Sequence, residues 1–162
     1  MEIQKKILFV CMGNICRSPT AEGVFRQLSS EYLSLSQLEI DSCGTIGYHV
    51  GESPDPRSIF AAQKRGYDLS SIRSRKITLD DMYYYDFILA MDEENLSNIF
   101  SLISDNEFHK HKTSLFLDYG VSNIACVPDP YYGGGSGFDD VIDLIEDASR
   151  GLISHLLNDL LD

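Results

Sequence analysis

The sequence predicts a single α/β domain in which a central, mostly parallel, four-stranded sheet is flanked by helices. Apolar runs typical of buried strands alternate with helical patterns along the chain, and the first such run leads through a Cys-to-Arg loop directly into the first helix. The length of 162 residues suits one hydrophobic core and leaves little for a second. The chain shows no repeat and no linker, so we expect residues 1–162 to form one domain.

The N-terminal part shows this alternation most clearly. Residues 6–10 (KILFV) are apolar, rich in β-formers and without alternation, which indicates a strand buried on both faces. Residues 17–30 carry apolar side chains at helical spacing. Ser18 suits the N-cap of this helix, and Glu22 is expected in its first turn, where the helix dipole favours an anion. Residues 38–43 are expected to form the second strand.

The rest of the chain follows the same rhythm. We expect a helix, a strand, a helix, a strand and a final helix, in that order, at residues 57–65, 86–91, 93–103, 113–117 and 138–161. Two segments rich in Gly and Pro are predicted to be loops, at residues 44–57 and 127–137. The final helix has an apolar face and an acidic face, and we interpret the acidic face as solvated surface.

The composition argues against several classes of function. The net charge of −12 and the pI near 4.6 disfavour nucleic acid and anionic membranes as partners. No apolar run approaches the roughly 20 residues of a membrane span, and the N-terminus has no signal-peptide pattern, so we expect a cytoplasmic protein. The four cysteines are expected to be free thiols, because their spacing fits no zinc site. We therefore expect neither a metal nor another cofactor.

The segment VCMGNICRSP, residues 10–19, carries the clearest chemical signal. Because it joins a buried strand to a helix start, it is expected at the carboxyl edge of the sheet, where α/β proteins bind ligands. Backbone N–H groups and the helix N-terminus attract an anion there and favour ionisation of Cys11 to a nucleophilic thiolate. The planar guanidinium of Arg17 suits bidentate binding of a phosphoryl group. Gly13 permits a tight or left-handed backbone and Asn14 tolerates a positive φ, so the loop can curl around an anion.

A Cys-x5-Arg pattern alone also has a simpler interpretation. Cys11 is the kind of small apolar side chain that packs at the end of a strand. A nucleotide-binding P-loop is discarded, because the segment contains no Gly-Lys-Ser/Thr. Further residues are therefore needed to favour chemistry over packing.

These further residues give the chain a clear resemblance to the low-molecular-weight protein tyrosine phosphatases. Residues 10–19 match the signature of that family nearly residue for residue, and DPYYG at 129–133 matches its second motif. The similarity covers essentially the whole chain, including residues 41–42, 44–45 and 91–92. It implies a metal-independent cysteine phosphatase that hydrolyses phosphotyrosine and small aryl phosphates.

The resemblance implies three catalytic residues. Cys11 would attack phosphorus and form a cysteinyl-phosphate, and Arg17 would hold the phosphoryl oxygens. Asp129 would protonate the leaving oxygen and then activate water against the intermediate. Ser18 would stabilise the Cys11 thiolate as a leaving group, a role that is compatible with capping the helix.

The same resemblance implies a substrate slot. Phosphate would lie within the loop formed by Met12, Gly13, Asn14, Ile15, Cys16 and Ser18. Tyr48 on one side and Tyr131 and Tyr132 on the other would form aromatic walls. A deep anion cradle between such walls would favour phosphotyrosine over the shorter phosphoserine. The expected partners are thus a phosphotyrosyl protein or peptide and, in the loop, phosphate or a similar oxyanion.

Residues around the loop are expected to hold its shape. Asn14 and Ser42 match positions that support it through side-chain hydrogen bonds, and Asp92 matches a carboxylate that anchors the arginine. A cap for the helix at residue 93 explains Asp92 equally well. Where many relatives carry a His, this chain has Ile72, so the support must differ, with Ser71 or a water as candidates. We expect this difference to alter stability more than activity.

Two related activities use a similar loop. Thioredoxin-coupled arsenate reductases need a downstream pair of redox cysteines, and residues 44–125 contain no Cys. Protein arginine phosphatases tend to carry Thr where this chain has Ile15. A non-catalytic phosphopeptide-binding module or a pure redox sensor is a further alternative. The joint presence of Cys11, Arg17, Ser18 and Asp129 argues against it, since binding alone needs neither nucleophile nor acid.

The remaining cysteines and histidines carry weaker signals. The resemblance implies a reversible disulfide between Cys16 and Cys11 that shields the nucleophile, and a small core residue is an equally good interpretation of Cys16. Cys43 and Cys126 are interpreted as packing residues. His49 and the other histidines show no converging partner, so we expect them to be ordinary surface or core residues.

Overall fold

A computed structural model describes residues 2–103, 107–130 and 137–160 of the chain. Four strands form one sheet in the order β2-β1-β3-β4, and its pairings β1–β2, β1–β3 and β3–β4 are parallel. The strands are β1 (Lys6–Cys11), β2 (Glu39–Gly44), β3 (Phe87–Ala90) and β4 (Thr113–Leu115). The prediction of an α/β domain with a four-stranded parallel sheet is confirmed.

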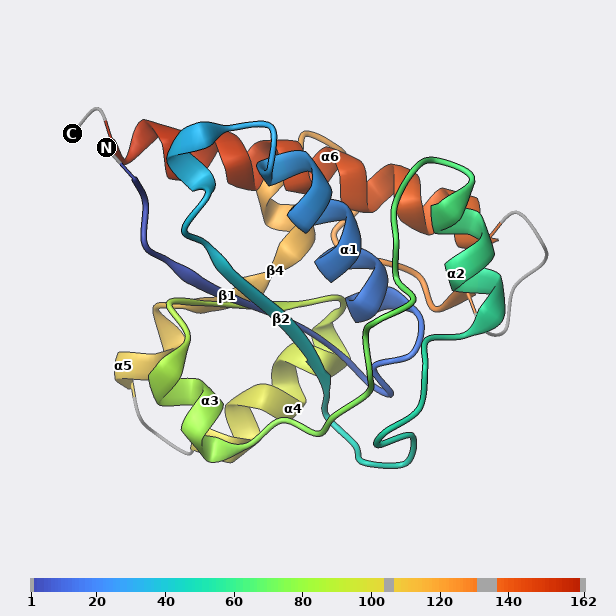
Figure 1. Cartoon of the computed structure of the whole chain (residues 1–162). Helices are drawn as coiled ribbons and strands as arrows, with labels where there is room; N and C mark the ends of the chain where they lie inside the picture. The colour runs from blue at the N-terminus through green and yellow to red at the C-terminus, as the bar shows by residue number, and fades with distance from the viewer. Residues whose placement is uncertain (1, 104–106, 131–136, 161–162) are drawn as a thin grey trace.

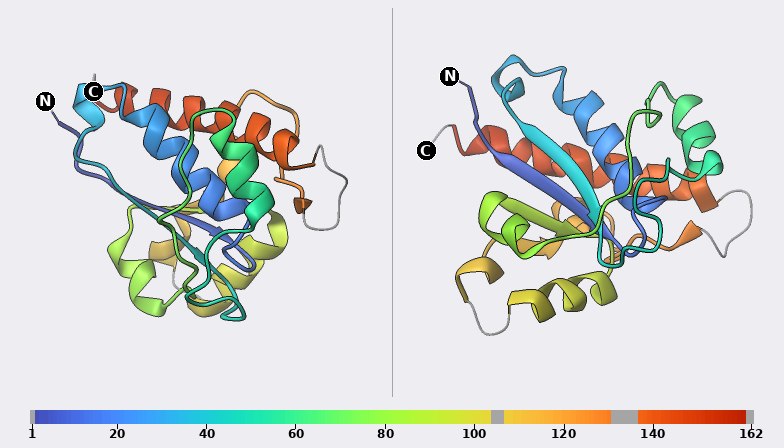
Figure 2. Two further views of the ribbon diagram at one scale, coloured as in Figure 1. Left: turned by 45° about the vertical axis from the view of Figure 1, so that its right-hand side comes forward. Right: turned by 60° about the horizontal axis from the view of Figure 1, so that its bottom comes forward.

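Helices cover both faces of this sheet (Figures 1 and 2). One face carries α1 (Arg17–Ser29) and α6 (Gly137–Asn158), with α2 (Pro56–Gln63) beside them. The other carries α3 (Leu79–Tyr84), α4 (Glu93–Ile103) and α5 (Glu107–Lys110), and two short 3-10 helices, η1 (Leu33–Leu35) and η2 (Phe116–Tyr119), complete the elements used below. Within the described ranges, no helix is both long enough and apolar enough to cross a membrane.

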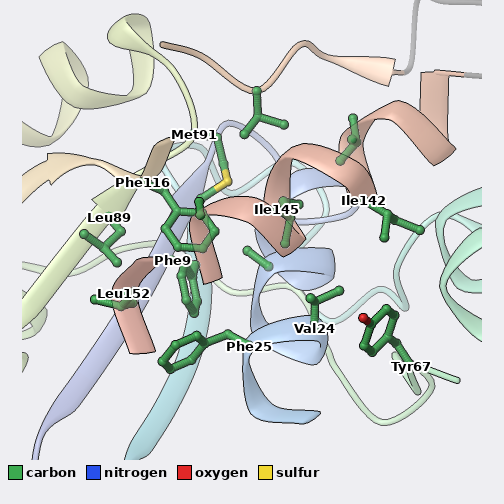
Figure 3. Packing of buried hydrophobic residues seen from close by; sticks show 14 of the residues in the cluster. Phe9, Val24, Phe25, Tyr67, Leu89, Met91, Phe116, Ile142, Ile145 and Leu152 are labelled. Carbon is green, nitrogen blue, oxygen red and sulfur yellow. The ribbon is translucent and has the colours of Figure 1, made fainter. Parts of the chain in front are cut away.

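The core is split by β1, which is buried on both faces as predicted. Ile7 and Phe9 pack toward α1 and α6, whereas Leu8 and Val10 belong to the cluster under α3 and α4. Phe9 lies between two other rings, with centroid distances of 5.7 Å to Phe25 and 4.8 Å to Phe116 (Figure 3). Each such edge-to-face pair contributes about 0.5–1.5 kcal/mol beyond burial. The strand that leads into the Cys-to-Arg loop is therefore firmly fixed.

The element boundaries agree with most predictions from the sequence. Helix α4 spans the predicted residues 93–103, and α6 buries the apolar face expected of the last helix. The fourth strand is shorter than predicted, since the chain turns into η2 at Phe116. Helix α3 was not predicted, although Thr78 and Asp81 form a capping box that starts it.

The acidic face of α6 is not simply solvated, so that interpretation was wrong in part. Arg65, just beyond α2, has its Nη1 2.7 Å from Asp143 Oδ1 and 2.7 Å from Glu146 Oε1. Asp147 Oδ2 accepts a hydrogen bond from the backbone N–H of Val121 at 3.1 Å. These carboxylates therefore attach the turn after α2 and the chain after η2 to the last helix.

Candidate active site

The Cys-to-Arg loop runs from the end of β1 to the start of α1, at the carboxyl edge of the sheet. Cys11 pairs in register with Gly44, the last residue of β2. A Cβ at position 44 would lie 2.6 Å from the carbonyl oxygen of Met12, closer than real contacts allow. Only glycine lets β2 approach the loop this closely, which gives a physical reason for the Gly44 that the motif comparison highlighted.

The carbonyl groups of the loop point outward and are bonded to surrounding segments. Five loop carbonyls accept hydrogen bonds from residues outside the loop or from α1. After β2, Thr45 N donates to the carbonyl of Cys11 (2.9 Å) and Ile46 N to that of Met12 (3.1 Å). The other three bonds run from Ser74 Oγ to Gly13 (3.0 Å), from Asp55 N to Ile15 (2.8 Å) and from Thr20 N to Cys16 (3.3 Å). In a trans peptide the next N–H points opposite to the carbonyl. The N–H groups that follow these carbonyls therefore turn toward the inside of the loop.

The N–H group of Asn14 shows that these groups point into the loop. Asn14 N donates to Cys11 Sγ at 3.2 Å, so the loop amides converge on the sulfur. The first helical residue of α1 is Arg17, and its N-terminal N–H groups lie on the same side of the loop. The arrangement suits a tetrahedral anion bound directly above Cys11.

Asn14 supplies the sharp turn of the loop. Its φ of 58° is left-handed, as predicted for a residue that tolerates this region. Gly13 does not adopt a positive φ, so that part of the expectation was wrong. Instead, a Cβ at position 13 would lie 3.2 Å from the ring of His49, so this glycine makes room for a neighbouring side chain.

Asn14 also connects the loop to its surroundings through its side chain. The amide nitrogen Nδ2 donates to Ser18 Oγ at 2.8 Å and to Ser42 Oγ at 3.0 Å. The oxygen Oδ1 accepts from Arg75 N at 3.0 Å. Ser18 Oγ in turn lies 3.0 Å from Cys11 Sγ. Asn14 and Ser18 are fully buried behind the pocket wall, so they support the loop rather than form its lining.

Ser18 is not the N-cap of α1. The cap position is Cys16, which makes no capping hydrogen bond through its side chain, and Ser18 lies within the first turn. Glu22 lies beyond that turn and is buried, with 5% of its surface exposed, so the expected dipole role near the N-terminus was also wrong. Both polar side chains are committed to contacts beneath the loop.

The support that Ile72 cannot provide comes from the residues that follow it. Ile72 is buried in the main core and Ser71 is exposed, so the suggestion of Ser71 was wrong. Ser74 Oγ donates to the carbonyl of Gly13, and Arg75 supplies its backbone N–H to Asn14. The guanidinium of Arg75 is itself held by ion pairs, with Asp41 at 3.0 Å and Asp81 at 2.9 Å.

Arg17 is held by residues of two other segments, one before α4 and one after η2. Its Nη1 lies 2.5 Å from Asp92 Oδ2 and donates to the carbonyl of Val127 at 3.1 Å, and its Nη2 lies 3.9 Å from Asp129 Oδ2. Burial of Arg17 works to lower the pKa of its guanidinium, but the charges of Cys11, Asp92 and Asp129 raise it overall. The guanidinium is therefore permanently charged and fixed in orientation beside the sulfur.

Asp92 performs both of the functions considered for it. Its Oδ2 anchors Arg17, and its Oδ1 accepts a hydrogen bond from Asn95 N at 2.7 Å in the first turn of α4. The two interpretations are compatible because each uses a different oxygen of the carboxylate.

The loop forms the floor of a pocket of about 200 Å³. For comparison, a cavity of about 150 Å³ holds a benzene ring, so one aryl phosphate group fits here. The pocket is lined by Cys11, Met12, Gly13, Ile15, Cys16, Arg17, Ile46, Tyr48, His49 and Asp129. It therefore brings together the predicted Cys11, Arg17, Asp129 and Tyr48, whereas Tyr131 and Tyr132 lie outside the described residues.

Two lining residues, Ile46 and His49, were missed from the sequence. His49 was expected to be an ordinary surface or core histidine, but its ring lies at the pocket, with Nδ1 2.6 Å from Glu52 Oε2. Its position next to Tyr48 in the same loop was the available signal. The ring of Tyr48 meets that of His49 edge to face, with centroids 4.8 Å apart.

The second cysteine of the loop is a poor nucleophile in this state. Burial, followed by the charge of Asp55, raises the pKa of Cys16 to about 12. Cys43 is also buried, and desolvation raises its pKa well above the ordinary value. All four cysteines are free thiols. A disulfide between Cys11 and Cys16 stays a prediction.

Comparisons with known proteins agree with this geometry. The family model described as low molecular weight phosphotyrosine protein phosphatase matches residues 6–160. The low molecular weight phosphotyrosine protein phosphatase of Schizosaccharomyces pombe is 41% identical over 155 residues, which cover 93% of this chain and 96% of that protein.

Solved structures give the same result. A protein tyrosine phosphatase from Entamoeba histolytica, with Hepes in its active site, superimposes with a TM-score of 0.89 and 39% identity, covering 95% of this chain and 97% of that one. The tyrosine phosphatase Wzb from Escherichia coli K30, in complex with sulphate, superimposes with a TM-score of 0.81 and 31% identity, covering 95% of this chain and 99% of that one.

Proposed function

The chain belongs to the low molecular weight phosphotyrosine protein phosphatase family and is a protein-tyrosine-phosphatase, and we propose that it hydrolyses phosphotyrosine through a cysteinyl-phosphate formed on Cys11. The observation that carries this mechanism is the convergence of three groups on one pocket. Cys11 lies on its floor, Arg17 beside the sulfur, and Asp129 at its rim. We take the phosphatase domain to span residues 1–162.

In the first step the Cys11 thiolate attacks phosphorus in line with the ester oxygen. The S–P bond forms as the P–O bond to the phenol breaks, and the departing oxygen takes the proton of Asp129. Charge on the equatorial oxygens is stabilised by the loop amides and by the fork of Arg17. These fixed donors supply the positive charge, so the proposed step uses no metal ion.

In the second step water attacks the cysteinyl-phosphate. The Asp129 carboxylate accepts a proton from that water, the new P–O bond forms, and the S–P bond breaks to return the thiolate and inorganic phosphate. Ser18 Oγ, 3.0 Å from the sulfur, is placed to donate a hydrogen bond to the departing thiolate.

The pocket walls support an aromatic substrate. Tyr48 and Ile46 are exposed at the rim, and Ile15 adds a further apolar side chain to the lining. An apolar wall favours a phenyl ring over the charged guanidinium of phosphoarginine, since that group would lose hydration there without gaining a partner. Tyr131 and Tyr132 are proposed to complete the opposite wall.

The proposed partners are a phosphotyrosyl protein or peptide and, in the loop, phosphate or a similar tetrahedral oxyanion. Sulphate bound by Wzb is a chemical precedent for the second. The proposed compartment is the cytoplasm, because four free thiols, three of them buried, suit a reducing environment.

Phosphate release from a phosphotyrosyl peptide tests the proposal, with EDTA and a thiol reductant present. Wild-type enzyme is expected to turn over, and Cys11→Ser is expected to lose all measurable turnover while keeping the wild-type melting temperature. Cys126→Ser, at a half-buried cysteine away from the pocket lining, is the matched control and is expected to retain activity.

Other substrates serve as the discriminating arms of this experiment. Turnover of phosphoarginine in preference to phosphotyrosine would make the protein an arginine phosphatase, and thioredoxin-dependent reduction of arsenate would make it an arsenate reductase. Phosphotyrosine hydrolysis that persists in Cys11→Ser, or that disappears in EDTA, would contradict the proposed mechanism.

A further inference from the structure

Glu22 is a buried carboxylate that the two chemical steps do not use. It lies on α1 beneath the loop and is 5% exposed. Its Oε1 accepts a hydrogen bond from Ser42 Oγ at 2.7 Å, and its Oε2 lies 2.8 Å from Arg26 Nη1. Burying an ionised side chain costs free energy that only well-placed partners offset. A buried carboxylate at this position is therefore expected to serve a function.

The charged groups around Glu22 come from two elements. Arg26 lies one turn further along α1, and its Nη2 also donates to the carbonyl of Ile40 at 2.8 Å. Asp41 on β2 repels the Glu22 charge, and is itself paired with Arg75. Burial is the largest influence and raises the pKa of Glu22, while Ser42 and Arg26 work to lower it.

Counting hydrogens shows how Glu22 is connected to the nucleophile. Arg75 N donates to Oδ1 of Asn14, so the NH2 group of that amide faces the two serines. Both amide hydrogens are then used, one toward Ser18 Oγ and one toward Ser42 Oγ. Each serine accepts at its oxygen and has a single hydrogen left to donate elsewhere.

Those two remaining hydrogens point to opposite ends of the network. The Ser42 hydrogen goes to the carboxylate of Glu22. The Ser18 hydrogen is left for Cys11 Sγ at 3.0 Å or the carbonyl of Cys43 at 3.3 Å. A thiolate is the stronger acceptor because it is charged. Asn14 therefore donates to both serines, and Ser18 donates to the sulfur, only while the group that faces Ser42 accepts its hydrogen.

We propose that Glu22 is a positioning residue, whose carboxylate orients Ser42 and Asn14 so that the Ser18 hydroxyl donates to Cys11 as the S–P bond breaks. The inference rests on the proposed cysteinyl-phosphate mechanism. Without an acceptor at position 22, the buried Ser42 hydrogen needs another partner. A rotated Asn14 amide offers its oxygen to Ser42, and offers it to Ser18 as well. The Ser18 hydroxyl then has a second acceptor that competes with the sulfur, so its hydrogen bond to Cys11 is weakened.

The variant Glu22→Gln tests this direction without changing shape. Arg26 is a donor, so the amide oxygen of the new side chain faces Arg26 and its NH2 group faces Ser42. The Ser42 oxygen then accepts a hydrogen bond from position 22, and the Ser42 hydrogen must find another acceptor. The backbone N–H of Arg75 resists rotation of the Asn14 amide, so we expect a partial loss.

Pre-steady-state hydrolysis of p-nitrophenyl phosphate gives the readout. In Glu22→Gln we expect kcat to fall about tenfold, because a hydrogen bond to a charged leaving group is weakened in the second step. The burst of p-nitrophenolate should stay near one equivalent per active site, and kcat/KM should change little, since the first step is intact. The inhibition constant for inorganic phosphate should be unchanged.

Arg26 provides the matched variants. Arg26→Met keeps the Glu22 acceptor opposite Ser42 and is expected to have a kcat near that of the wild type. In the double variant Glu22→Gln with Arg26→Met, no donor competes for the amide oxygen, which can face Ser42 again. We expect kcat to recover in the double variant.

The outcomes separate this inference from the proposed function. Turnover by the wild type without any phosphoryl group trapped on Cys11 would overturn the cysteinyl-phosphate mechanism itself. A functional wild type with an unchanged kcat in Glu22→Gln would overturn only the role of Glu22. So would an equal loss in kcat and kcat/KM, or a double variant as slow as Glu22→Gln, because packing or charge alone would then explain the effect.

Discussion

The floor of the pocket and its rim differ in how firmly the fold holds them. The floor comprises Cys11 and Arg17, which line the pocket, together with Asn14 and Ser18, which support them from behind; all four are at most 4% exposed. The rim consists of Ile46, Tyr48, His49 and Asp129. Tyr48 is 82% exposed and Ile46 42%, and the side chain of Asp129 is 30% exposed.

The difference extends to the hydrogen bonds. Floor residues are tied to segments more than 60 residues away in sequence, including Ser74, Arg75, Asp92 and Val127. On the rim, His49 pairs with a neighbour in its own loop, Glu52. Preorganised charge on the floor stabilises the transferring phosphoryl group without reorganisation. A less constrained rim suits substrates that share a phosphorylated ring and differ around it.

Arg17→Lys should remove the bidentate phosphate contact on the floor of the pocket. An ammonium is a point charge and cannot keep two phosphoryl oxygens, Asp92 and the carbonyl of Val127 in contact at once, so we expect kcat/KM for a phosphotyrosyl peptide to fall about 10³-fold. Steady-state kinetics measures this loss, and Arg65→Lys, in the turn just beyond α2, is the control. A loss below about tenfold would mean that bidentate geometry is unimportant.

Asp129→Asn should remove the chemical contribution of the rim without disturbing the floor. We expect kcat for a phosphotyrosyl peptide to fall about 10²-fold, because the leaving phenolate is no longer protonated. The loss should be smaller for p-nitrophenyl phosphate, whose leaving group needs less protonation. Comparison of the two substrates measures it, with Asp118→Asn as control. An equal loss for both substrates would argue against a general acid.

Tyr48→Ala should remove a recognition surface of the rim. We expect KM for the peptide to rise about 3- to 10-fold, from the loss of one ring contact. Thermal melting should be unchanged, since this side chain is largely exposed. Tyr83→Ala, another exposed tyrosine, is the control for the assay. A large fall in melting temperature would contradict the idea that the rim side chains contribute little to the stability of the fold.

Glu22→Gln should show that the buried carboxylate beneath the floor lowers the stability of the folded protein. The pKa of Glu22 is raised in the folded protein, chiefly by burial, so the folded state binds this proton more tightly than the unfolded state. The resulting stability is present below the unfolded pKa and is lost as pH rises through the folded pKa. The melting temperature of the variant, relative to that of the wild type, should therefore rise as the pH increases above about 4, the ordinary pKa of a Glu carboxyl. A constant difference would contradict the raised pKa.

The sequence was most informative where chain neighbours determine structure. The strand at residues 6–10, the loop that follows it and the helix from Arg17 are contiguous, and local patterns were enough to place them. The boundaries of α4 were predicted for the same reason. Helix α3 was missed although its signal, Thr78 followed by Asp81, was present, because the adjacent tyrosines were interpreted only as packing.

What could not be predicted depends on contacts between distant segments. Nothing in the sequence near Glu22 indicates that Ser42 lies against it, and the replacement of a His by Ile72 hides that Ser74 and Arg75 support the loop instead. Which carboxylates of α6 are paired likewise depends on where Arg65 lies. In each case the partner is fixed by the register of β2 or by packing of helices, which residue patterns do not specify.

The most direct measurement is the site of covalent phosphorylation during turnover. Enzyme mixed with p-nitrophenyl phosphate is quenched in acid within the burst, digested and mapped by mass spectrometry, with Cys11→Ser as control. We expect one phosphoryl group on the peptide that contains Cys11, assigned to that sulfur by fragmentation and absent from the variant. A phosphoryl group on Cys16 or another residue, or no covalent intermediate during active turnover, would contradict the mechanism built on this floor.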